Sequence, residues 1–148
     1  MTSDLQALYR ELIVDHNRQP RNFRMLAAGR KAEGFNPLCG DRLTVYVQIE
    51  NGAIRDVGFQ GLGCAIATAS ASLMTEHIKG KTVADADALF ERVQRMVTEA
   101  LDAPVDDLGA LSALAGVRRF PVRVKCAMLG WHTMRAAAAS SDDVVTTE

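Results

Sequence analysis

The stretch CGDRLTVYVQIENGAIRDVGFQGLGC, residues 39–64, decides how this chain folds. Apolar residues alternate with polar ones over residues 43–49, which is the period of two expected of a strand with one buried face. The dipeptide Asn51-Gly52 follows, and it is the strongest short signal for a hairpin turn. A second apolar segment then spans residues 54–59. The stretch therefore predicts a long antiparallel hairpin.

This hairpin brings residues that are distant in sequence to one place. Cys39 and Asp41 stand at its beginning and Cys64 at its end. Because the two outer ends of an antiparallel hairpin are adjacent, these three side chains are predicted to be neighbours. Gly40 tolerates the positive φ that a tight bend between Cys39 and Asp41 requires.

The remaining cysteine, Cys126, is predicted to lie in the early turns of a helix that starts at Pro121. Three thiols and one carboxylate form a tetrahedral donor set suited to zinc, or a sulfur-rich seat for an iron–sulfur cluster. We therefore predict a metal site formed by Cys39, Asp41, Cys64 and Cys126. The alternative is that the three cysteines are small buried hydrophobic residues.

The charges near these residues favour reactive thiolates. Three thiolates and a carboxylate around Zn²⁺ have a net charge of about −2, which needs compensation when the site is partly buried. Arg42, Arg123 and Lys125 are the candidate cations, and nearby cations also lower the pKa of a thiol. The chain has no paired CxxC knuckles of the kind that structural zinc sites use. A mixed site with one oxygen ligand is expected to be labile, so that a freed thiolate can take up sulfur as a persulfide.

The rest of the chain is mainly helical by its apolar spacing. The predicted helices span residues 3–17, 65–79, 82–100, 107–115 and 121 onward, with a short edge strand at residues 30–36. We therefore predict an α+β fold with a small, mainly antiparallel, three-stranded sheet and helices packed on one face. Residues 1–139 are predicted to form a single domain and residues 140–148 a disordered tail.

Composition excludes several classes of function. The 148 residues carry a net charge of −1 and contain no long basic tract, so nucleic-acid binding is not expected. No apolar run approaches the ~18 residues of a membrane span, and the N-terminus lacks the pattern of a signal peptide. Three cysteines are an odd number, which argues against a disulfide framework. We expect a protein of the reducing cytoplasm.

The cysteine-bearing segments also resemble a known family. The segments that carry this resemblance are residues 36–41, residues 61–67 with 69–72, and residues 120–127. They are similar to the three motifs of the IscU/NifU N-terminal family of iron–sulfur cluster assembly proteins. Residues 8–9, 15–16 and 20–22 resemble the family's N-terminal signature. The resemblance covers nearly the whole chain except the tail.

Within that family the sequence is most similar to the SufU branch. Scaffold-type members carry a histidine directly before the third cysteine, where this chain has Lys125. The extra length between the second and third cysteines, around residues 80–110, also resembles that branch. This resemblance implies a zinc-dependent sulfurtransferase of the SUF system. Such a protein accepts persulfide sulfur from a SufS-type cysteine desulfurase, stimulates that enzyme, and passes sulfur toward the SufBCD complex.

By the same resemblance, Cys39, Asp41, Cys64 and Cys126 are the metal ligands, and Cys39 is the sulfur acceptor. Two alternatives stay open at this point. The protein could be a scaffold that binds iron and a transient [2Fe–2S] cluster for transfer to apo-proteins. It could also be a structural zinc module that only binds and stimulates the desulfurase. Arg123 and Lys125 could in addition meet an acidic surface of a partner.

Overall fold

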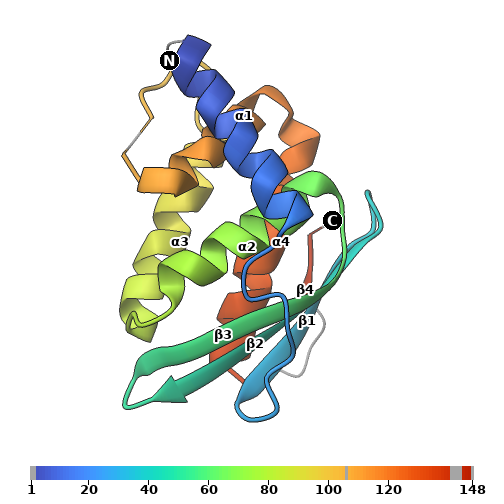
Figure 1. Ribbon diagram of the computed structural model, residues 1–148, viewed down its shortest axis with the longest axis vertical. Helices are drawn as coiled ribbons and strands as arrows, with labels where there is room; N and C mark the ends of the chain where they lie inside the picture. The colour runs from blue at the N-terminus through green and yellow to red at the C-terminus, as the bar shows by residue number, and fades with distance from the viewer. Residues whose placement is uncertain (1–2, 106, 141–144, 148) are drawn as a thin grey trace.

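The structure is a computed structural model that describes residues 3–105, 107–140 and 145–147 (Figure 1). Its elements follow in the order α1 (Ser3–Arg18), β1 (Arg30–Asn36), β2 (Asp41–Glu50), β3 (Ala53–Leu62), α2 (Ala65–Ile78), α3 (Val83–Thr98), the 3₁₀ helix η1 (Gly109–Arg119), α4 (Pro121–Ala138) and β4 (Val145–Thr146). The predicted α+β class is confirmed: Figure 1 shows the helices gathered on one face of the sheet.

The sheet has the order β3-β2-β1-β4, and its three long strands are antiparallel. The predicted hairpin is β2–β3, with Val45 opposite Phe59 and a register irregularity between Gln48 and Ile49. The prediction of three strands was one strand short. β4 pairs in parallel with β1 at Gly34 and Phe35, so β1 is not an edge strand along this part of its length.

The added strand comes from the segment 140–148, for which the sequence predicted disorder. Of that segment, residues 141–144 and 148 lie outside the described residues. Val145 and Thr146 pair with β1, and the amide of Thr147 donates to the carbonyl of Phe35 at 3.2 Å. A two-residue parallel pairing between segments so far apart has no pattern of its own in the sequence, since period-two alternation needs a longer run.

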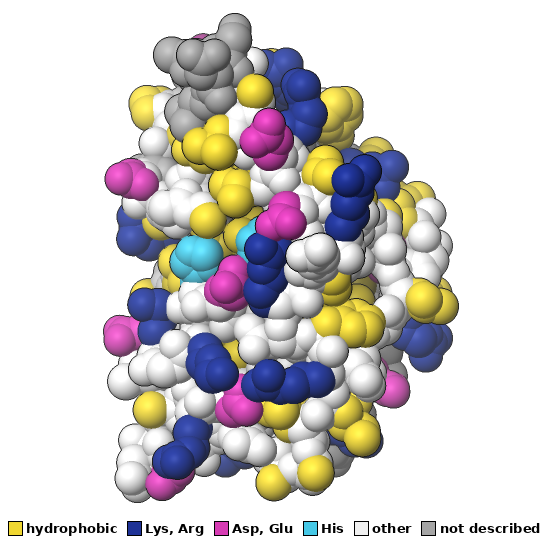
Figure 2. All heavy atoms as spheres, in the orientation of Figure 1, with side chains coloured by type: hydrophobic (Ala, Val, Ile, Leu, Met, Phe, Trp, Pro, Cys, Tyr) yellow, Lys and Arg dark blue, Asp and Glu magenta, His cyan; other side chains and the backbone are white. Residues whose placement is uncertain are grey.

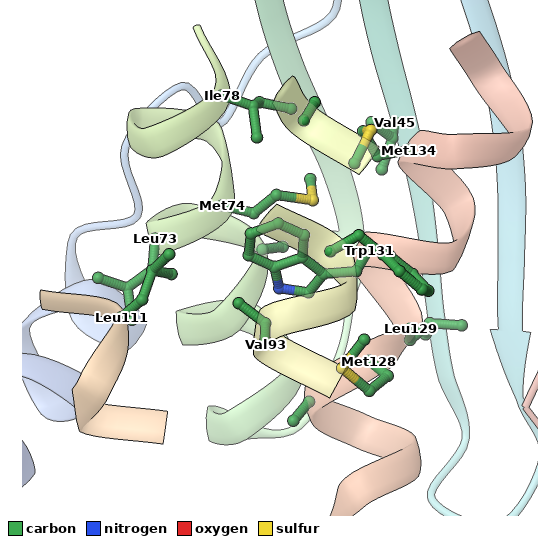
Figure 3. Close-up of a cluster of buried hydrophobic side chains, with 14 of the residues drawn as sticks. Val45, Leu73, Met74, Ile78, Val93, Leu111, Met128, Leu129, Trp131 and Met134 are labelled. Atoms are coloured by element: carbon green, nitrogen blue, oxygen red, sulfur yellow. The ribbon is translucent and has the colours of Figure 1, made fainter. Parts of the chain in front are cut away.

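The core lies between the sheet and the helices, and α4 is its central element. Trp131 of α4 is fully buried, and Figure 3 shows its ring among side chains from α2, α3 and α4. Its indole N–H donates to Ser70 Oγ at 3.2 Å, and Ser70 Oγ donates to the carbonyl of Ala127 at 2.6 Å. A Cβ on Gly130 would lie 3.1 Å from Ala71 Cβ, so α2 and α4 are packed closely. This packing holds together the two helices that carry Cys64 and Cys126.

The predicted short helix at residues 107–115 is the 3₁₀ helix η1, which runs on to Arg119. The buried side chain of Arg118 anchors it. Its guanidinium donates to the carbonyls of Met96 at 2.5 Å, Ala103 at 2.7 Å and Pro104 at 3.3 Å. Because these carbonyls belong to the end of α3 and the loop after it, Arg118 fixes η1 against the inserted region of the chain.

The contact between α1 and α2 depends on a buried histidine. His16 Nδ1 lies 2.7 Å from Ser72 Oγ, which also accepts a hydrogen bond from the amide of Arg21 at 2.8 Å. Burial lowers the pKa of His16, and the positive charge of Arg21 lowers it further. The neutral imidazole is therefore the form that suits the folded protein.

This histidine predicts a loss of stability in acid. The unfolded chain takes up a proton on His16 near pH 6.5, whereas the folded state resists that proton until the pH is lower. The free energy of unfolding is therefore expected to fall as the pH falls from 7.5 toward 5. His16→Asn, which keeps a polar partner for Ser72, should show a smaller fall when both proteins are unfolded in urea.

The pKa of His132 is also lowered, chiefly by burial, and contributes in the same direction. The pH slopes of the wild type, His16→Asn and His132→Asn are therefore compared, so that the contribution of each histidine is measured separately. Equal pH slopes for the wild type and His16→Asn would contradict the role given to His16.

Candidate metal site

The ends of the hairpin meet as the sequence predicts. Asp41 is the first residue of β2, and Cys64 follows β3 as the N-cap of α2. The amide of Cys64 donates to Asp41 Oδ1 at 2.8 Å. The buried carboxylate of Asp41 therefore connects the start of the hairpin to the N-terminus of α2, where the helix dipole favours negative charge.

Cys126 forms a compact group with Cys39 and Asp41 at the start of the hairpin. Its Sγ lies 3.4 Å from Cys39 Sγ. One ligand atom from each of Cys39, Asp41 and Cys126 lies within 4.8 Å of the others. The three differ in accessibility, because Cys39 is exposed whereas Asp41 and Cys126 are buried. One thiol of the group is thus open to a partner, and the rest of the group is protected.

Cys64 adjoins this group without being part of it. Its Sγ lies 3.9 Å from Asp41 Oδ2 and accepts a hydrogen bond from the amide of Ala67 at 3.4 Å. The sulfur therefore serves as the side-chain cap of α2. A fourth metal–sulfur bond would require Cys64 Sγ to leave this cap.

The donor types fit the zinc ion that the sequence suggests. Zinc prefers thiolates, accepts a carboxylate oxygen, and is usually bound by four tetrahedral ligands. The group offers two sulfurs and an oxygen, and Cys64 provides a third sulfur beside the same carboxylate. The same atoms also suit iron, so the donor set does not decide between the two metals.

Asn36 is a site residue to which the sequence analysis assigned no role. It is buried at the end of β1, directly opposite Asp41 in the register. Its Nδ2 donates to Asp41 Oδ2 at 3.1 Å and to Cys126 Sγ at 3.4 Å, and its Oδ1 accepts from the amide of Leu38 at 3.3 Å. One amide therefore orients two candidate ligands and the turn that carries Cys39. Asn36 ends the predicted strand at residues 30–36, so antiparallel pairing of that strand with the next could have placed it opposite Asp41.

The candidate cations differ in their positions. Arg123 is the one whose guanidinium reaches the thiols, with its Nη1 3.7 Å from Cys39 Sγ and 4.0 Å from Cys126 Sγ. These hydrogen-bonding and charged sulfurs raise the pKa of Arg123. Arg42 instead lies over the ring of Phe35, 5.0 Å from its centroid. Lys125 is half-buried beside Cys126 on α4.

The environment of Cys126 makes its thiolate costly without a cation. Burial raises the pKa of this thiol far above its ordinary value, and the hydrogen bond with Cys39 and the nearby charge of Cys64 raise it further. A buried thiol of this kind gives up its proton when a cation compensates the negative charge, and a coordinating metal ion does so most effectively.

Asn36 provides a test of how the group is oriented. Asn36→Ala removes two hydrogen bonds to candidate ligands, and the loss of such a supporting contact typically weakens metal binding about 10- to 100-fold. We expect a decrease of about 10-fold in zinc affinity, measured by competition with a chelating dye. Gln48→Ala, which removes an exposed amide at the far end of β2, is the control. Equal affinities for the wild type and Asn36→Ala would contradict this role.

The fold and the site together define a class: a small α+β protein whose hairpin and helix N-termini bring together a cysteine–carboxylate group that could hold a metal ion, with one exposed thiol. The model of the NifU-like N-terminal domain family matches residues 8–143. The chain therefore belongs to this family, which confirms the resemblance seen in its motifs.

The relatives include proteins with two different descriptions. The chain is 36% identical to the zinc-dependent sulfurtransferase SufU of Bacillus subtilis. The similarity extends over 140 residues and covers 95% of each chain. It is 35% identical over 139 residues to the iron–sulfur cluster assembly scaffold protein IscU of Streptococcus pyogenes, covering 94% of this chain and 87% of that protein.

The solved structures agree with this assignment. A crystal structure described as a putative iron–sulfur cluster assembly scaffold protein for the SUF system, from Fervidobacterium islandicum, superposes with a TM-score of 0.78. It shares 34% sequence identity and covers 92% of this chain and 98% of that chain. In the part of the chain that the structure describes, no helix has the length and apolar character needed to cross a membrane.

Proposed function

We propose that this protein is a zinc-dependent sulfurtransferase of iron–sulfur cluster assembly that accepts persulfide sulfur on Cys39. The observation that carries the proposal is the exposed Cys39 thiol, which lies against a buried thiol and an arginine. A relative with 36% identity over nearly the whole chain is described as such an enzyme, which supports the proposal. The proposed donor is a SufS-type cysteine desulfurase and the proposed recipient is the SufBCD complex.

The reaction at Cys39 is a thiol–persulfide exchange. The Cys39 thiolate attacks the terminal sulfur of the donor's persulfide, and a new S–S bond forms on Cys39. The S–S bond of the donor breaks, its electron pair stays on the donor cysteine, and that cysteine leaves as a thiolate. Cys39 then carries the sulfur as a persulfide, and no external oxidant or reductant is needed.

Several residues of this chain support that exchange. Arg123 Nη1 lies 3.7 Å from Cys39 Sγ and places a positive charge beside the attacking sulfur. Asn36 accepts a hydrogen bond from the turn that carries Cys39 and donates one to Asp41, and Asp41 accepts one from the amide of Cys64. Cys64 and Cys126, with Asp41 and Cys39, would hold the zinc. When bound, the metal ion supplies positive charge that keeps the clustered thiols deprotonated.

The test is the position of the transferred sulfur. Zinc-loaded protein is incubated with a SufS-type desulfurase and cysteine, exposed persulfides and thiols are alkylated, and peptides are analysed by mass spectrometry. We expect one additional sulfur atom on the peptide that contains Cys39. Sulfur found only on the peptide of Cys64 or of Cys126 would contradict the assignment of the acceptor, and no added sulfur would contradict the transfer.

The second candidate function is a scaffold for a transient [2Fe–2S] cluster. It is favoured by the sulfur-rich donor group and by relatives described as scaffold proteins. In that case iron and the cluster would be cargo. Anaerobic incubation with iron and sulfide tests this function, because a stable cluster absorbing visible light would favour the scaffold over the sulfurtransferase.

A further inference from the structure

A groove runs from the metal site along the side of the molecule, between α1 and η1. Its volume is about 420 Å³, and the walls come from α1, η1 and the first residues of α2 and α4. The residues on which the argument depends are Arg10, Ile13, Gly116, Arg119, Phe120 and Arg123. Arg123 also contacts Cys39, so the groove ends at the thiol proposed to accept sulfur.

The groove has an apolar floor and a positively charged rim. Ile13 and Val117 contribute apolar surface, whereas Arg10 and Arg119 contribute exposed guanidinium groups. The described residues that line the groove include no carboxylate. On the face shown in Figure 2, Lys and Arg side chains lie over and beside α1 among hydrophobic side chains and some Asp and Glu side chains, so the excess of positive charge is at the groove rim. This combination is complementary to an apolar group flanked by negative charge.

The apolar surface continues around the metal site. Leu38 and Leu62, next to the segments of Cys39 and Cys64, are 58% and 82% exposed. Phe120 and Val122, before Cys126, are 61% and 56% exposed. Large apolar side chains gathered beside a reactive group are typical of a surface that meets another protein. A free small anion would leave these side chains uncovered.

We propose that the groove receives a segment of the sulfur-donating protein in which a large apolar side chain adjoins carboxylates, and that this contact holds the donor over Cys39. The identity of the donor rests on the proposed function. The donor is assigned to the groove because the groove ends at Cys39, over which the donor's persulfide must be held.

Two kinds of groove variant test this proposal without altering a candidate ligand. Arg10→Glu combined with Arg119→Glu reverses the charge of the rim. Gly116→Trp fills the groove, since a Cβ on Gly116 meets nothing within 4 Å and the backbone needs no positive φ. The control is Arg92→Glu with Arg95→Glu on the exposed face of α3, which makes the same change of charge elsewhere.

Binding of the zinc-loaded protein to a SufS-type desulfurase is measured by calorimetry. The turnover of the desulfurase is measured as a function of the concentration of this protein. We expect both groove variants to weaken binding about 10-fold or more, as changes in the centre of an interface do. Turnover at saturating concentration should stay at the wild-type value, because Cys39 and its neighbours are unchanged. The control variant should bind like the wild type.

Unchanged affinity in both groove variants, with zinc content and thermal unfolding preserved, would overturn the inference while leaving the proposed function intact. Loss of saturating turnover without loss of affinity would also overturn it, because the groove would then act on the chemistry. If wild-type protein neither binds the desulfurase nor takes up its sulfur, the proposed function fails, and the inference fails with it.

Discussion

Cys39→Ala is expected to abolish sulfur acceptance while the protein keeps its metal. Cys39 is the exposed member of the group, so its removal leaves the buried candidate ligands Asp41 and Cys126 and the adjacent Cys64 in place. No other exposed thiol exists among the chain's three cysteines, since Cys64 is half-buried and Cys126 is buried. Labelled sulfur from cysteine should therefore reach this variant at less than about one hundredth of the wild-type rate, as is typical when a nucleophile is removed.

The matched variant is Cys126→Ala, in which the main expected effect is loss of zinc. Removing one of four ligands costs roughly a quarter of a zinc binding free energy of about 10–16 kcal/mol, which corresponds to a loss of affinity of about 100- to 1000-fold. This variant should be purified with little zinc. Cys39→Ala should retain a near-stoichiometric amount, because Cys39 is exposed and water can take the open ligand position there, whereas the position of Cys126 is buried. Zinc content measured by atomic emission compares the two directly.

The same pair of variants separates transfer from simple stimulation. If Cys39→Ala retains zinc, binds the desulfurase and stimulates it fully, Cys39 accepts no sulfur and the protein acts as a structural zinc module. If Cys39→Ala loses its zinc as completely as Cys126→Ala, the exposed and buried cysteines contribute equally, and the distinction drawn between them is wrong.

The position of the site could be predicted because local patterns determine it. The alternation over residues 43–49 and the turn at Asn51-Gly52 fix the register of β2 and β3, and antiparallel pairing then brings Asp41 to Cys64. Cys126 could be added because it is the remaining cysteine and follows a helix start at Pro121. These inferences need spacing alone.

Other features depend on contacts between segments that have no common pattern. Asn36 lies opposite Asp41 in the strand register and donates a hydrogen bond to Cys126. Cys126 belongs to α4, which begins 85 residues after Asn36, at Pro121. Cys64 was assigned to the metal, whereas its sulfur also caps α2, because a thiol at a helix N-terminus can do either. The groove beside Arg123 arises from how α1 packs against η1, and the period of one helix does not predict that arrangement.

Gly61→Ala tests the closed end of the hairpin on which the whole site depends. Gly61 has a φ of +143°, a conformation that residues with a side chain rarely adopt, and it pairs with Leu43 in the register. An alanine Cβ there would overlap the carbonyl oxygen of Arg42 and lie 2.9 Å from Leu43 Cα. Both atoms belong to the backbone of β2, so no side chain can move aside, and the strands must separate.

We expect a loss of about 3–4 kcal/mol in the free energy of unfolding, within the range of substitutions that strain a special backbone position. For a chain of this size the midpoint of thermal unfolding should fall by about 10 °C. Zinc affinity should fall by more than about 10-fold as well. Asp41 begins β2 and Cys64 follows the end of β3, so parting these strands separates the two residues, and a ligand set that loses its supporting contacts binds metal more weakly.

Gly52→Ala is the matched control, since it also has a positive φ of +78° but a Cβ there meets nothing within 4 Å. It carries the conformational cost without the overlap, so a loss of about 1 kcal/mol with unchanged zinc affinity is expected. Circular dichroism on heating gives the stabilities, and dye competition gives the affinities. If Gly61→Ala were no worse than Gly52→Ala, tight closure of the hairpin would not be what brings Asp41 to Cys64, and the site would have to be held by α4 and Asn36 instead.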